Sequence, residues 1–468
     1  KFEKPIVVSA VCLSMILSVG SCAGDGFDEE TFSGGVTNTQ LESPDASKVS
    51  FEKLAGKPSV KVEWPVIMGA GGYLFSMYIV DDPTNPVAVV KDSIIDGCSV
   101  ACTYLDDTNY KVEIKTLGND KYNNKDAASV SEVTWSTLVP ATTIPAGTDL
   151  NTYFENNPIT SGKDVEVAYE LEAGGSYTIS GDLNLGVNNV QLRGNKVNHA
   201  KVTFTGSGAI VSSGGMALKF IDFDCDVVSK GSFVKFGDVP EEIKGMNSYG
   251  IVTNPMIIQS CEIRNVRHYL VNINGKKYAI QNFIVRDCLI KFYQDAEIFN
   301  FNSNSSFVKD FELSSSTLYN LSEASNGRFM RVAGGKGADV GWADCSMNFT
   351  SNTFYNISCD QEAFNSNVWN RQKNTVNLSK NIFYDSCKGE FNRRIVGGRT
   401  DNAKTCDNNC YWYKGGSGLE KEANGNYGDK STSAYGVDPG FKDPANGDFT
   451  VRHSEVISHG SGDPRWLK

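Results

Sequence analysis

The sequence lacks several features that assign a function class directly. No block of basic residues occurs and the net charge is −11, so we expect no nucleic-acid partner. Neither a Ser/His/Asp hydrolase elbow nor a phosphate-binding glycine loop occurs. Proline is scarce, with 14 residues among 468, whereas glycine contributes 45. Because no motif assigns the chemistry, the architecture of the chain is the main guide to its function.

Asparagine is the residue in excess, and its distribution is uneven. Of 41 asparagines, 6 lie in residues 1–140 and 35 lie in residues 141–468. Asparagine and glycine favour turns and are depleted from strand interiors. We therefore predict an all-β protein of two parts, with a long, turn-rich β architecture after residue 140.

The N-terminal residues predict export. Lys1 and Lys4 precede an apolar run over residues 6–17, which is shorter than the ~20 residues needed to cross a bilayer. Residues 17–22 resemble the lipobox of bacterial lipoproteins, and the acidic residues after Cys22 are similar to the segment that marks surface-exposed lipoproteins of the Bacteroidetes. The resemblance implies a signal peptide over residues 1–21, lipidation at Cys22 and an outer-membrane lipoprotein at the cell surface. An ordinary signal peptide with an incidental cysteine is the alternative.

The 12 cysteines do not form a metal-binding or redox pattern. Cys98 and Cys102, like Cys406 and Cys410, are not spaced as a CxxC motif and have no nearby histidine. Most others stand singly in apolar stretches, at Cys225, Cys261, Cys288, Cys345, Cys359 and Cys387. We therefore predict free, buried thiols and no structural zinc.

Residues 51–140 predict a small β-sandwich. Alternating apolar residues mark strands at residues 60–64, 73–80 and 110–115. Trp64, the strand that starts at Tyr73 and the spacing from Leu105 to Tyr110 resemble the core and tyrosine corner of a fibronectin type III module, although Asp107 stands where proline is common. The resemblance implies a spacer. Within residues 22–50, the stretch from residue 31 is rich in Ser, Thr, Gly and Pro, and we expect a flexible tether there.

An internal repeat of about 28 residues begins after residue 160. Its reference positions are Leu192, Phe220, Ile258, Val285, Leu313, Phe349, Leu378 and Cys406. Three residues later comes a small or polar column: Cys261, Cys288, Ser316, Asn352, Asn381 and Asn409. Two residues further comes an apolar column: Ile263, Ile290, Leu318, Phe354, Phe383 and Tyr411.

A parallel β-helix explains both columns, because it stacks equivalent residues at roughly 4.8 Å per coil. In such a fold the asparagines form turn ladders. We also expect a short helix over residues 148–157 to cap the open end, because an uncapped coil would expose its core and its strand edges.

The repeat and the C-terminal segments 438–450 and 462–466 resemble pectin-lyase-like β-helices, in particular those of Bacteroidetes lipoproteins with a fibronectin-like module. The resemblance implies a right-handed parallel β-helix over residues 141–468, a single-stranded solenoid of about eight coils, and a setting in pectin use. A galacturonan hydrolase of this fold needs paired aspartates and typically a Gly-His-Gly motif. None of the 4 histidines stands in that motif, so a hydrolase is disfavoured.

Basic and amide side chains mark a second strand in successive repeats. Successive side chains of a strand point to opposite faces, so these polar side chains face outward if Val271, Phe299 and Met330 face the core. The predicted ligand-binding residues are Lys235, Asn272, Asn274, Asn300, Asn302, Arg331 and Arg393, with Lys276 beside them. Such a face suits a polyuronate, whose carboxylates accept bidentate arginine bonds. Ion pairs with Glu297, Glu362 and Glu390 explain the same residues equally well.

Charge is also unevenly distributed. Residues 218–400 carry a net charge of +2, whereas the remainder carries −13. The contrast favours a negatively charged partner for the repeat region.

Two further patterns each allow two interpretations. Asp222, Asp224 and Asp226 alternate along one predicted strand; they would bind Ca²⁺ through oxygen ligands, as in lyases of this fold, or pair with basic residues of the next coils. An aromatic column consists of Tyr319, Tyr355, Tyr384 and Trp412. It would stack on sugar rings or form a ladder of its own, and we favour the ladder.

We predict a lipid-anchored surface protein that binds acidic, pectin-type polysaccharide on its β-helix for an outer-membrane glycan uptake complex. The alternative is a polysaccharide lyase that cleaves polyuronate by β-elimination, with Arg331, Arg393, Lys235 or Lys276 as the base. A purely structural or adhesive protein fits if the inserts near residues 238–255 and 336–346 block the basic face.

Overall fold

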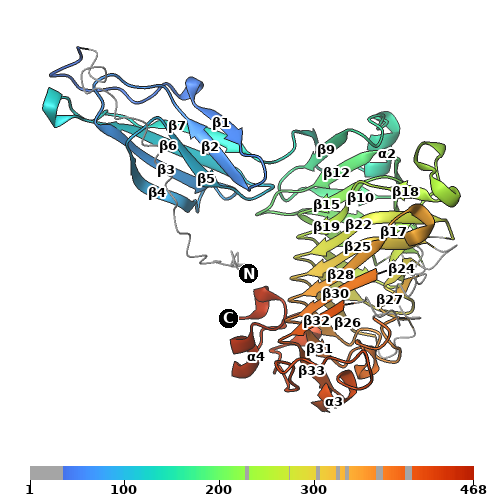
Figure 1. Ribbon diagram of the computed structural model, residues 1–468. Helices are drawn as coiled ribbons and strands as arrows, with labels where there is room; N and C mark the ends of the chain where they lie inside the picture. The colour runs from blue at the N-terminus through green and yellow to red at the C-terminus, as the bar shows by residue number, and fades with distance from the viewer. Residues whose placement is uncertain are drawn as a thin grey trace. The chain divides into compact units, whose positions relative to one another are not determined.

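The computed structural model describes residues 35–226, 231–273, 275–301, 306–322, 327–332, 337–364, 373–395 and 403–468. The chain divides after Pro140 into two compact units. Within the described residues most of the regular secondary structure of both units is strand (Figure 1), as the composition predicts. No helix in this part of the chain is long and apolar enough to span a membrane.

The N-terminal unit packs two antiparallel sheets around one core. The first sheet has the order β1 (Ser50–Lys53), β2 (Ser59–Glu63) and β5 (Ser99–Thr103). The second has the order β4 (Val87–Ile95), β3 (Gly72–Ile79), β6 (Asn109–Leu117) and β7 (Ser131–Ser136). Trp64, directly after β2, stacks on Phe75 of the other sheet with ring centroids 5.8 Å apart. The Tyr110 hydroxyl accepts a hydrogen bond from the Leu105 backbone N–H at 2.6 Å, as that spacing predicts.

The segment predicted as a tether is held against this unit over its described part. Leu41 is buried, and its backbone N–H donates to the Lys125 carbonyl at 3.1 Å. Asn38 donates in the same way to the Tyr122 carbonyl at 3.0 Å. A 3₁₀ turn over Ala46–Lys48 then leads into β1. The flexible tether therefore does not extend to residue 50, because an apolar anchor and backbone partners fix the chain from residue 38.

The C-terminal unit is a parallel β-solenoid whose coils contribute strands to three sheets (Figure 1). Sheet I runs through β8 (Ala141–Ile144), β9 (Glu166–Leu171), β12 (Asn189–Arg193), β15 (Met216–Lys219), β19 (Met256–Gln259), β22 (Tyr278–Arg286), β25 (Phe307–Ser314), β28 (Asp344–Thr350), β30 (Lys373–Ser379) and β32 (Ala403–Asp407). A further strand, β18 (Gly250–Val252), pairs with β22.

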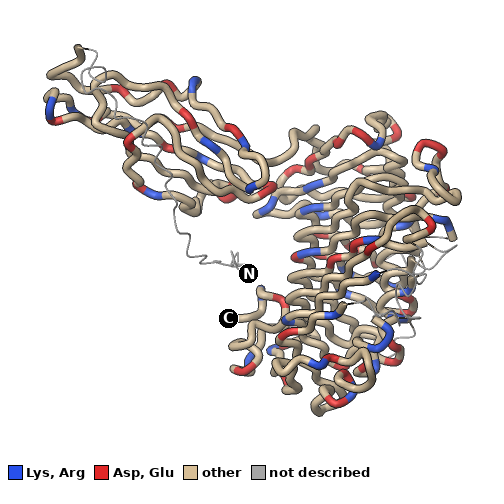
Figure 2. Tube along the Cα trace, viewed as in Figure 1, with Lys and Arg blue, Asp and Glu red and all other residues tan. Residues whose placement is uncertain are grey.

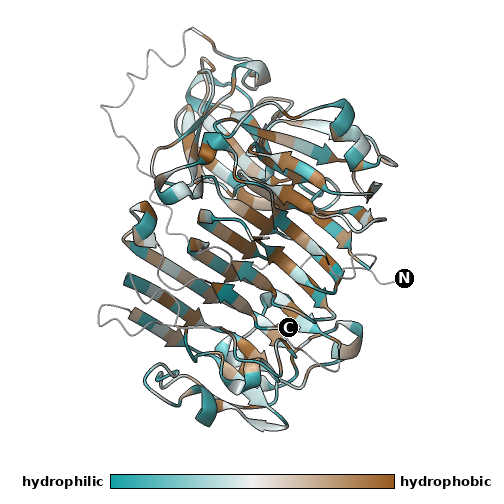
Figure 3. Ribbon diagram, turned by 90° about the vertical axis from the view of Figure 1, so that its right-hand side faces the viewer, coloured by the Kyte–Doolittle hydropathy of each residue, from teal (hydrophilic) through white to brown (hydrophobic). Residues whose placement is uncertain are grey.

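Sheets II and III complete each coil. Sheet II runs through β10 (Ser176–Ile179), β13 (Ala200–Phe204), β16 (Ile221–Asp224), β20 (Glu262–Val266), β23 (Leu289–Phe292), β26 (Thr317–Asn320), β29 (Thr353–Tyr355), β31 (Ile382–Tyr384) and β33 (Cys410–Tyr413), ending on the antiparallel β34 (Gly416–Ser417). Sheet III runs through β11 (Leu183–Gly186), β14 (Ile210–Ser212), β17 (Ser232–Phe236), β21 (Tyr269–Asn272), β24 (Phe299–Phe301) and β27 (Met330–Val332). Apolar residues gather on these stacked strands (Figure 3).

The register confirms the repeat alignment at all reference positions except Phe220. Leu218, not Phe220, pairs with Leu192 on one side and with Ile258 on the other. Phe220 instead occupies the corner after the strand, with φ of 58°. The same left-handed corner recurs directly before each member of the repeat column Cys261, Cys288, Ser316, Asn352, Asn381 and Asn409. The corner residues are Ser260, Asp287, Ser315, Ser351, Lys380 and Asn408, with φ between 47° and 58°. The corner turns the chain from sheet I into sheet II.

A buried amide ladder crosses the coils directly after this corner. Asn381 Oδ1 accepts from the backbone N and from Nδ2 of Asn352, at 3.1 and 2.9 Å. Asn409 Oδ1 accepts from Asn381 N and Nδ2, both at 3.0 Å. All three asparagines are fully buried. Each amide thus satisfies a corner N–H that has no strand partner, and the predicted ladder is confirmed.

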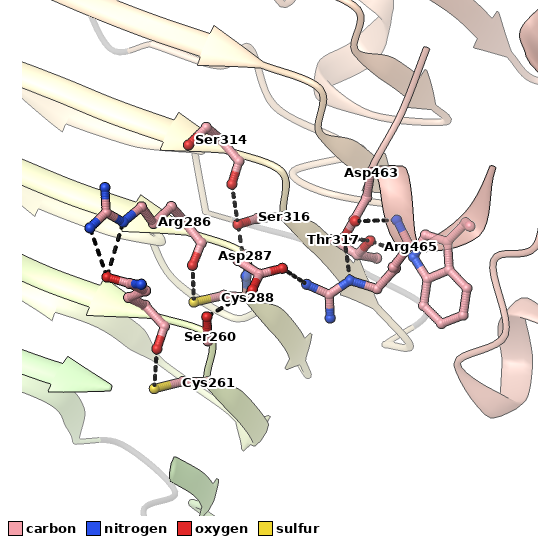
Figure 4. Close-up of polar contacts among 12 residues, drawn as sticks. Ser260, Cys261, Arg286, Asp287, Cys288, Ser314, Ser316, Thr317, Asp463 and Arg465 are labelled. Carbon is pink, nitrogen blue, oxygen red and sulfur yellow. Dashed lines mark hydrogen bonds and ion pairs between the residues drawn. The ribbon is translucent and has the colours of Figure 1, made fainter. Parts of the chain in front are cut away.

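The ladder continues toward the N-terminal coils with smaller side chains. Ser316 Oγ accepts from Cys288 N at 3.0 Å, and Ser316 N donates to Asn352 Oδ1 at 3.1 Å. Cys261, Cys288 and Ser316 each bond back to the carbonyl two residues earlier (Figure 4).

The ten cysteines in the described part of the chain are free thiols. Five of the six single cysteines predicted to be buried are buried, whereas Cys359 is partly exposed. Burial raises the pKa of Cys288 to about 12, so this thiol stays protonated inside the ladder.

Both ends of the solenoid are closed. The predicted N-terminal cap forms as α2 (Leu150–Asn156), which buries Leu150 and Phe154 and is capped by the Asp149 side chain. At the other end, the chain passes α3 (Leu419–Glu422) and folds back across sheet II, carrying α4 (Ser454–His459).

This returning segment covers the aromatic column. Tyr355 and Tyr384 stack with centroids 4.9 Å apart, and Phe449 packs on Tyr319 and Tyr355 at 5.1 and 5.3 Å. Phe441 packs on Tyr384 at 5.6 Å. The column is therefore a structural ladder rather than an open sugar-stacking surface, as predicted.

A buried clasp fastens the segment. Asp463 accepts from the Thr317 hydroxyl at 2.8 Å, and Trp466 Nε1 donates to the same hydroxyl at 2.8 Å. Arg465 forms ion pairs with Asp463 and Asp287, at 2.8 and 3.2 Å (Figure 4). Burial raises the pKa of Asp463 to about 6 despite the nearby guanidinium.

Replacing Asn381 with alanine should lower the free energy of unfolding by about 3 kcal/mol, because the buried backbone N–H and the Nδ2 group of Asn352 both lose their acceptor. Asn377→Ala is the matched control: this asparagine is only partly buried and bonds to Asn348 at 2.8 Å, so its loss should cost less than about 1 kcal/mol. Urea unfolding of the two variants measures the difference. Equal costs would argue against the ladder as a main source of stability.

The clasp makes stability depend on pH. Because the folded-state pKa of Asp463 lies above its ordinary value of 3.8, its stabilising contribution is full below pH 4 and is lost as the pH rises through about 6. The unfolding free energy of the wild type relative to Asp463→Asn should therefore fall between pH 4 and pH 6 and level off above. Parallel pH profiles of the two proteins would contradict this assignment.

Candidate functional site

Sheet III carries a polar column on its outer face. The register pairs Lys235 of β17 with Asn272 of β21, Asn272 with Asn300 of β24, and Asn300 with Arg331 of β27. Asn300 Nδ2 donates to Asn272 Oδ1 at 3.1 Å. Val271, Phe299 and Met330, which adjoin them in the strands, are buried, so the polar side chains face outward as the alternation predicts. We call Lys235, Asn272, Asn300 and Arg331 the polar column.

Three predicted residues lie outside the described part of the chain. They are Cys22, Asn274 and Asn302. The polar column is therefore defined by the other side chains.

The predicted cations on or beside sheet III are all paired with carboxylates. Lys235 contacts Asp182 at 2.6 Å, and Arg331 contacts Glu297 at 3.3 Å. Lys276, beside the column, contacts Asp238 at 2.5 Å. Acidic and basic residues alternate along the solenoid rather than forming one uniformly cationic face (Figure 2).

Arg393 does not belong to the polar column. Residues 391–394, predicted as a strand, form turns after the 3₁₀ helix Cys387–Gly389. The Arg393 side chain contacts Glu390 and Glu362, both at 2.9 Å, and is about half exposed. The hydrogen bond to Glu390 and the charges of both carboxylates raise the pKa of Arg393 above its ordinary value.

Three guanidinium groups converge on the single carboxylate of Glu362. Arg328, Arg393 and Arg394 contact it at 3.2, 2.9 and 2.9 Å, and Glu362 is only 15% exposed. Arg328 also donates to the Phe364 carbonyl at 3.2 Å, which fixes its position. We call these three arginines and Glu362 the arginine cluster. Arg393 also contacts Glu390, so the described part of the cluster joins three guanidinium groups and two carboxylates.

A cavity of about 220 Å³ borders the arginine cluster at Arg393. Its lining residues are Glu390, Arg393, Lys421, Glu422, Asn424, Gly425, Asn426 and Tyr427. Glu422 is buried and accepts from the backbone N–H groups of Phe391 and Asn392, at 2.6 and 2.9 Å. Burial raises the pKa of Glu422. Since ligand pockets usually measure about 300–1,000 Å³, the cavity can take an end or side group of a polymer rather than the polymer itself.

The predicted calcium site is not formed. Asp222 binds His199 at 2.8 Å, Asp224 accepts from Asn265 at 2.9 Å, and Asp226 pairs with Arg267 at 2.7 Å. The strand ends at Asp224, so the alternation does not extend to Asp226. Among the described residues no three His, Cys, Asp or Glu side chains come together as metal ligands. Two hydrogen-bonded contacts and one ion pair to neighbouring coils thus occupy the three carboxylates.

A histidine beside the polar column was missed from the sequence. His268 lies directly before β21, and its Nδ1 is 2.6 Å from Asp295 Oδ1 in the next coil. His268 stands between Arg267 and Tyr269 and is therefore not part of a Gly-His-Gly motif. The available signal was the separation of 27 residues, which is one repeat and therefore places the two side chains one coil apart.

Three family models, each described as a domain of unknown function, match successive parts of the chain. They match residues 6–174 (DUF4992), 175–321 (DUF4957) and 347–466 (DUF5123), and the first extends past Pro140 through β9. No curated protein matches the sequence. A structure of the Yersinia enterocolitica family 28 exopolygalacturonase aligns with 78% of this chain and 99% of that chain, at 9% identity and a TM-score of 0.15. That likeness is too weak to support an argument about activity.

The arginine cluster can be tested without any sugar. Replacing Glu362 with glutamine leaves three guanidinium groups facing one another, so the unfolding free energy should fall by about 2–3 kcal/mol at low salt. Added sulfate should recover part of this loss by occupying the vacated anion position. Glu390→Gln is the matched control, because Arg393 keeps Glu362 and sulfate should have little effect. Thermal unfolding of both variants with and without sulfate measures this difference. An equal response of the two variants would argue against an anion site.

Proposed function

We propose that the polar column and the arginine cluster bind acidic polysaccharide of the pectin type. The observation that carries this proposal is the convergence of Arg328, Arg393 and Arg394 on one carboxylate. The cluster already binds one carboxylate through three guanidinium groups. A uronic acid polymer offers the same group at every sugar unit.

The ion pairs of the polar column favour exchange with such a ligand. Arg331 is 44% exposed in its pair with Glu297, and Lys235 is 28% exposed in its pair with Asp182. Asp182 is about half exposed, and exposed pairs contribute roughly 0–1 kcal/mol, so a polymer carboxylate can replace Asp182 on Lys235 at little cost. Glu297 is only 17% exposed, so a polymer carboxylate would contact Arg331 beside Glu297. Asn272 and Asn300 lie between the two cations and supply amide groups for hydroxyl oxygens.

The column is long enough for several sugar units. It spans three coil steps from Lys235 to Arg331, or roughly 14 Å at about 4.8 Å per step. A polymer lying along it would contact successive coils, with its end near the arginine cluster.

The cellular setting completes the proposal. We infer an exported, lipid-anchored protein with Cys22 as the modified residue, displayed at the cell surface as in Bacteroidetes lipoproteins. The N-terminal unit would serve as a fibronectin type III-like spacer, an assignment supported by its two antiparallel sheets and the Tyr110 to Leu105 contact. Glycan held on the solenoid would pass to an outer-membrane uptake complex.

Lyase chemistry with an arginine or lysine base is not favoured by this geometry. Arg331, Arg393, Lys235 and Lys276 each contact at least one protein carboxylate, so each of these side chains is already engaged in an ion pair. A base must instead be able to take up a proton. The binding role therefore has the better support from these four residues.

Binding is tested by titrating the purified chain with oligogalacturonate in a calorimeter. Arg331→Ala should weaken binding about tenfold, equivalent to ~1.4 kcal/mol, because one charge-assisted contact is lost. Binding should also weaken with added salt, since it depends on charge.

Arg286→Ala is the matched control. This arginine bonds Gln259 at 3.0 and 2.8 Å on sheet I, away from the polar column, and its loss should change the affinity less than twofold. Equal binding of a neutral galactan, or equal effects of the two arginine substitutions, would count against the proposed site.

A further inference from the structure

Beside the polar column lies a group that binding alone does not require: His268, Tyr269 and Asp295. Asp295 Oδ1 is 2.6 Å from His268 Nδ1, and the His268 ring packs edge-on against Tyr269 with centroids 4.1 Å apart. A carboxylate on Nδ1 accepts its proton and fixes the ring, so that Nε2 is the nitrogen left to take up a proton. His268 is 23% exposed, so solvent and ligands can reach it.

The pairing of Val271 with Phe299 places Tyr269 one coil from Glu297. Tyr269 begins β21, whose last residue is Asn272 of the polar column. The charges that act on the Tyr269 phenol are those of Glu297, Arg331 and Asp295. Glu297 in turn contacts Arg331 at 3.3 Å. Burial is the main cause that raises the pKa of Tyr269, so the phenol keeps its proton near neutral pH.

We propose that His268 is the base and Tyr269 the acid of a β-elimination on polyuronate, with Arg331 holding the carboxylate of the reacting sugar. Asp295 acts as a positioning residue through His268. The proposal rests on the proposed function, because Arg331 must hold a uronate at this place on sheet III. It replaces the arginine or lysine base with an imidazole, the side chain used most often as a base at neutral pH.

The reaction balances without a redox partner. His268 Nε2 removes the proton from C5, the carbon that bears the carboxylate. The released electron pair forms the C4–C5 double bond as the bond between C4 and the glycosidic oxygen breaks. That oxygen takes the phenol proton of Tyr269, and the proton on His268 returns to Tyr269 through water. Arg331 stabilises the negative charge that develops on the carboxylate.

A second histidine provides a matched control within the same solenoid. His199 Nδ1 binds Asp222 at 2.8 Å and is also 23% exposed. Its aromatic neighbour is Phe220, at 6.4 Å, rather than a tyrosine. It lies beside sheet II, before β13, where no residue of the polar column is found. If coil-to-coil His–Asp pairs only stabilise the solenoid, the two histidines should respond alike.

The test measures turnover and affinity together. The purified chain is incubated with polygalacturonate, polymannuronate or polyglucuronate, and the ultraviolet absorbance of unsaturated uronate is followed. On the polymer that reacts, His268→Ala should lower kcat at least about 100-fold while affinity changes less than threefold. His199→Ala should leave turnover unchanged. Asp295→Asn should lower kcat with little change in KM, because it disturbs the orientation of His268 but not the binding of the polymer.

Each outcome separates the two proposals. Binding of the polymers without any unsaturated product overturns the elimination and leaves the binding function intact. Product formation that His268→Ala does not reduce overturns the role of His268. If none of the three polymers binds, the proposed function is overturned, and the elimination with it.

Discussion

The solenoid depends on how it satisfies the backbone at its left-handed corners. At each corner between sheets I and II the chain leaves one strand before joining the next, and the N–H after the corner has no strand partner. Asn352, Asn381 and Asn409 supply the missing acceptors from the next coil, and their own Nδ2 groups donate to buried carbonyls such as Leu313 O and Leu378 O. Because an unpaired buried N–H would cost about 1–3 kcal/mol at each coil, the ladder fixes both the register and the stacking direction.

The ladder also explains how the outer face is organised. Strict stacking carries equivalent positions into columns, so a polar residue on the outside of one strand has neighbours in the same place one coil above and below. Lys235, Asn272, Asn300 and Arg331 become a column for this reason. The His268 and Asp295 pair and the His199 and Asp222 pair arise in the same way, since each joins one coil to the next.

The sequence predicted the periodic parts of the structure best. The repeat columns that start at Cys261 and Ile263 follow from the repeat length, and the end of the solenoid requires a cap. The outward direction of Asn272 and Arg331 follows from the alternation of side chains along a strand. Phe220 was placed two residues out of register because the step from Leu192 to Leu218 is 26 residues, two fewer than the repeat of about 28. The contacts around Glu362 were only partly foreseen, since Arg328 and Arg394 reach it from separate coils and turns. Asp226 was misplaced because the end of a short strand is not visible in an alternating pattern.

The C-terminal clasp has a consequence for the order of folding. Thr317 and Asp463 are 146 residues apart in the sequence, so their contact closes a long loop and must form late. Until then the tyrosine ladder of sheet II has no cover, although the coils beneath it can already stack from neighbour to neighbour. A newly made chain would therefore expose this aromatic strip until the C-terminal segment has folded back over it. Once it has folded back, the C-terminal segment shields the tyrosine ladder of sheet II from contact with other chains.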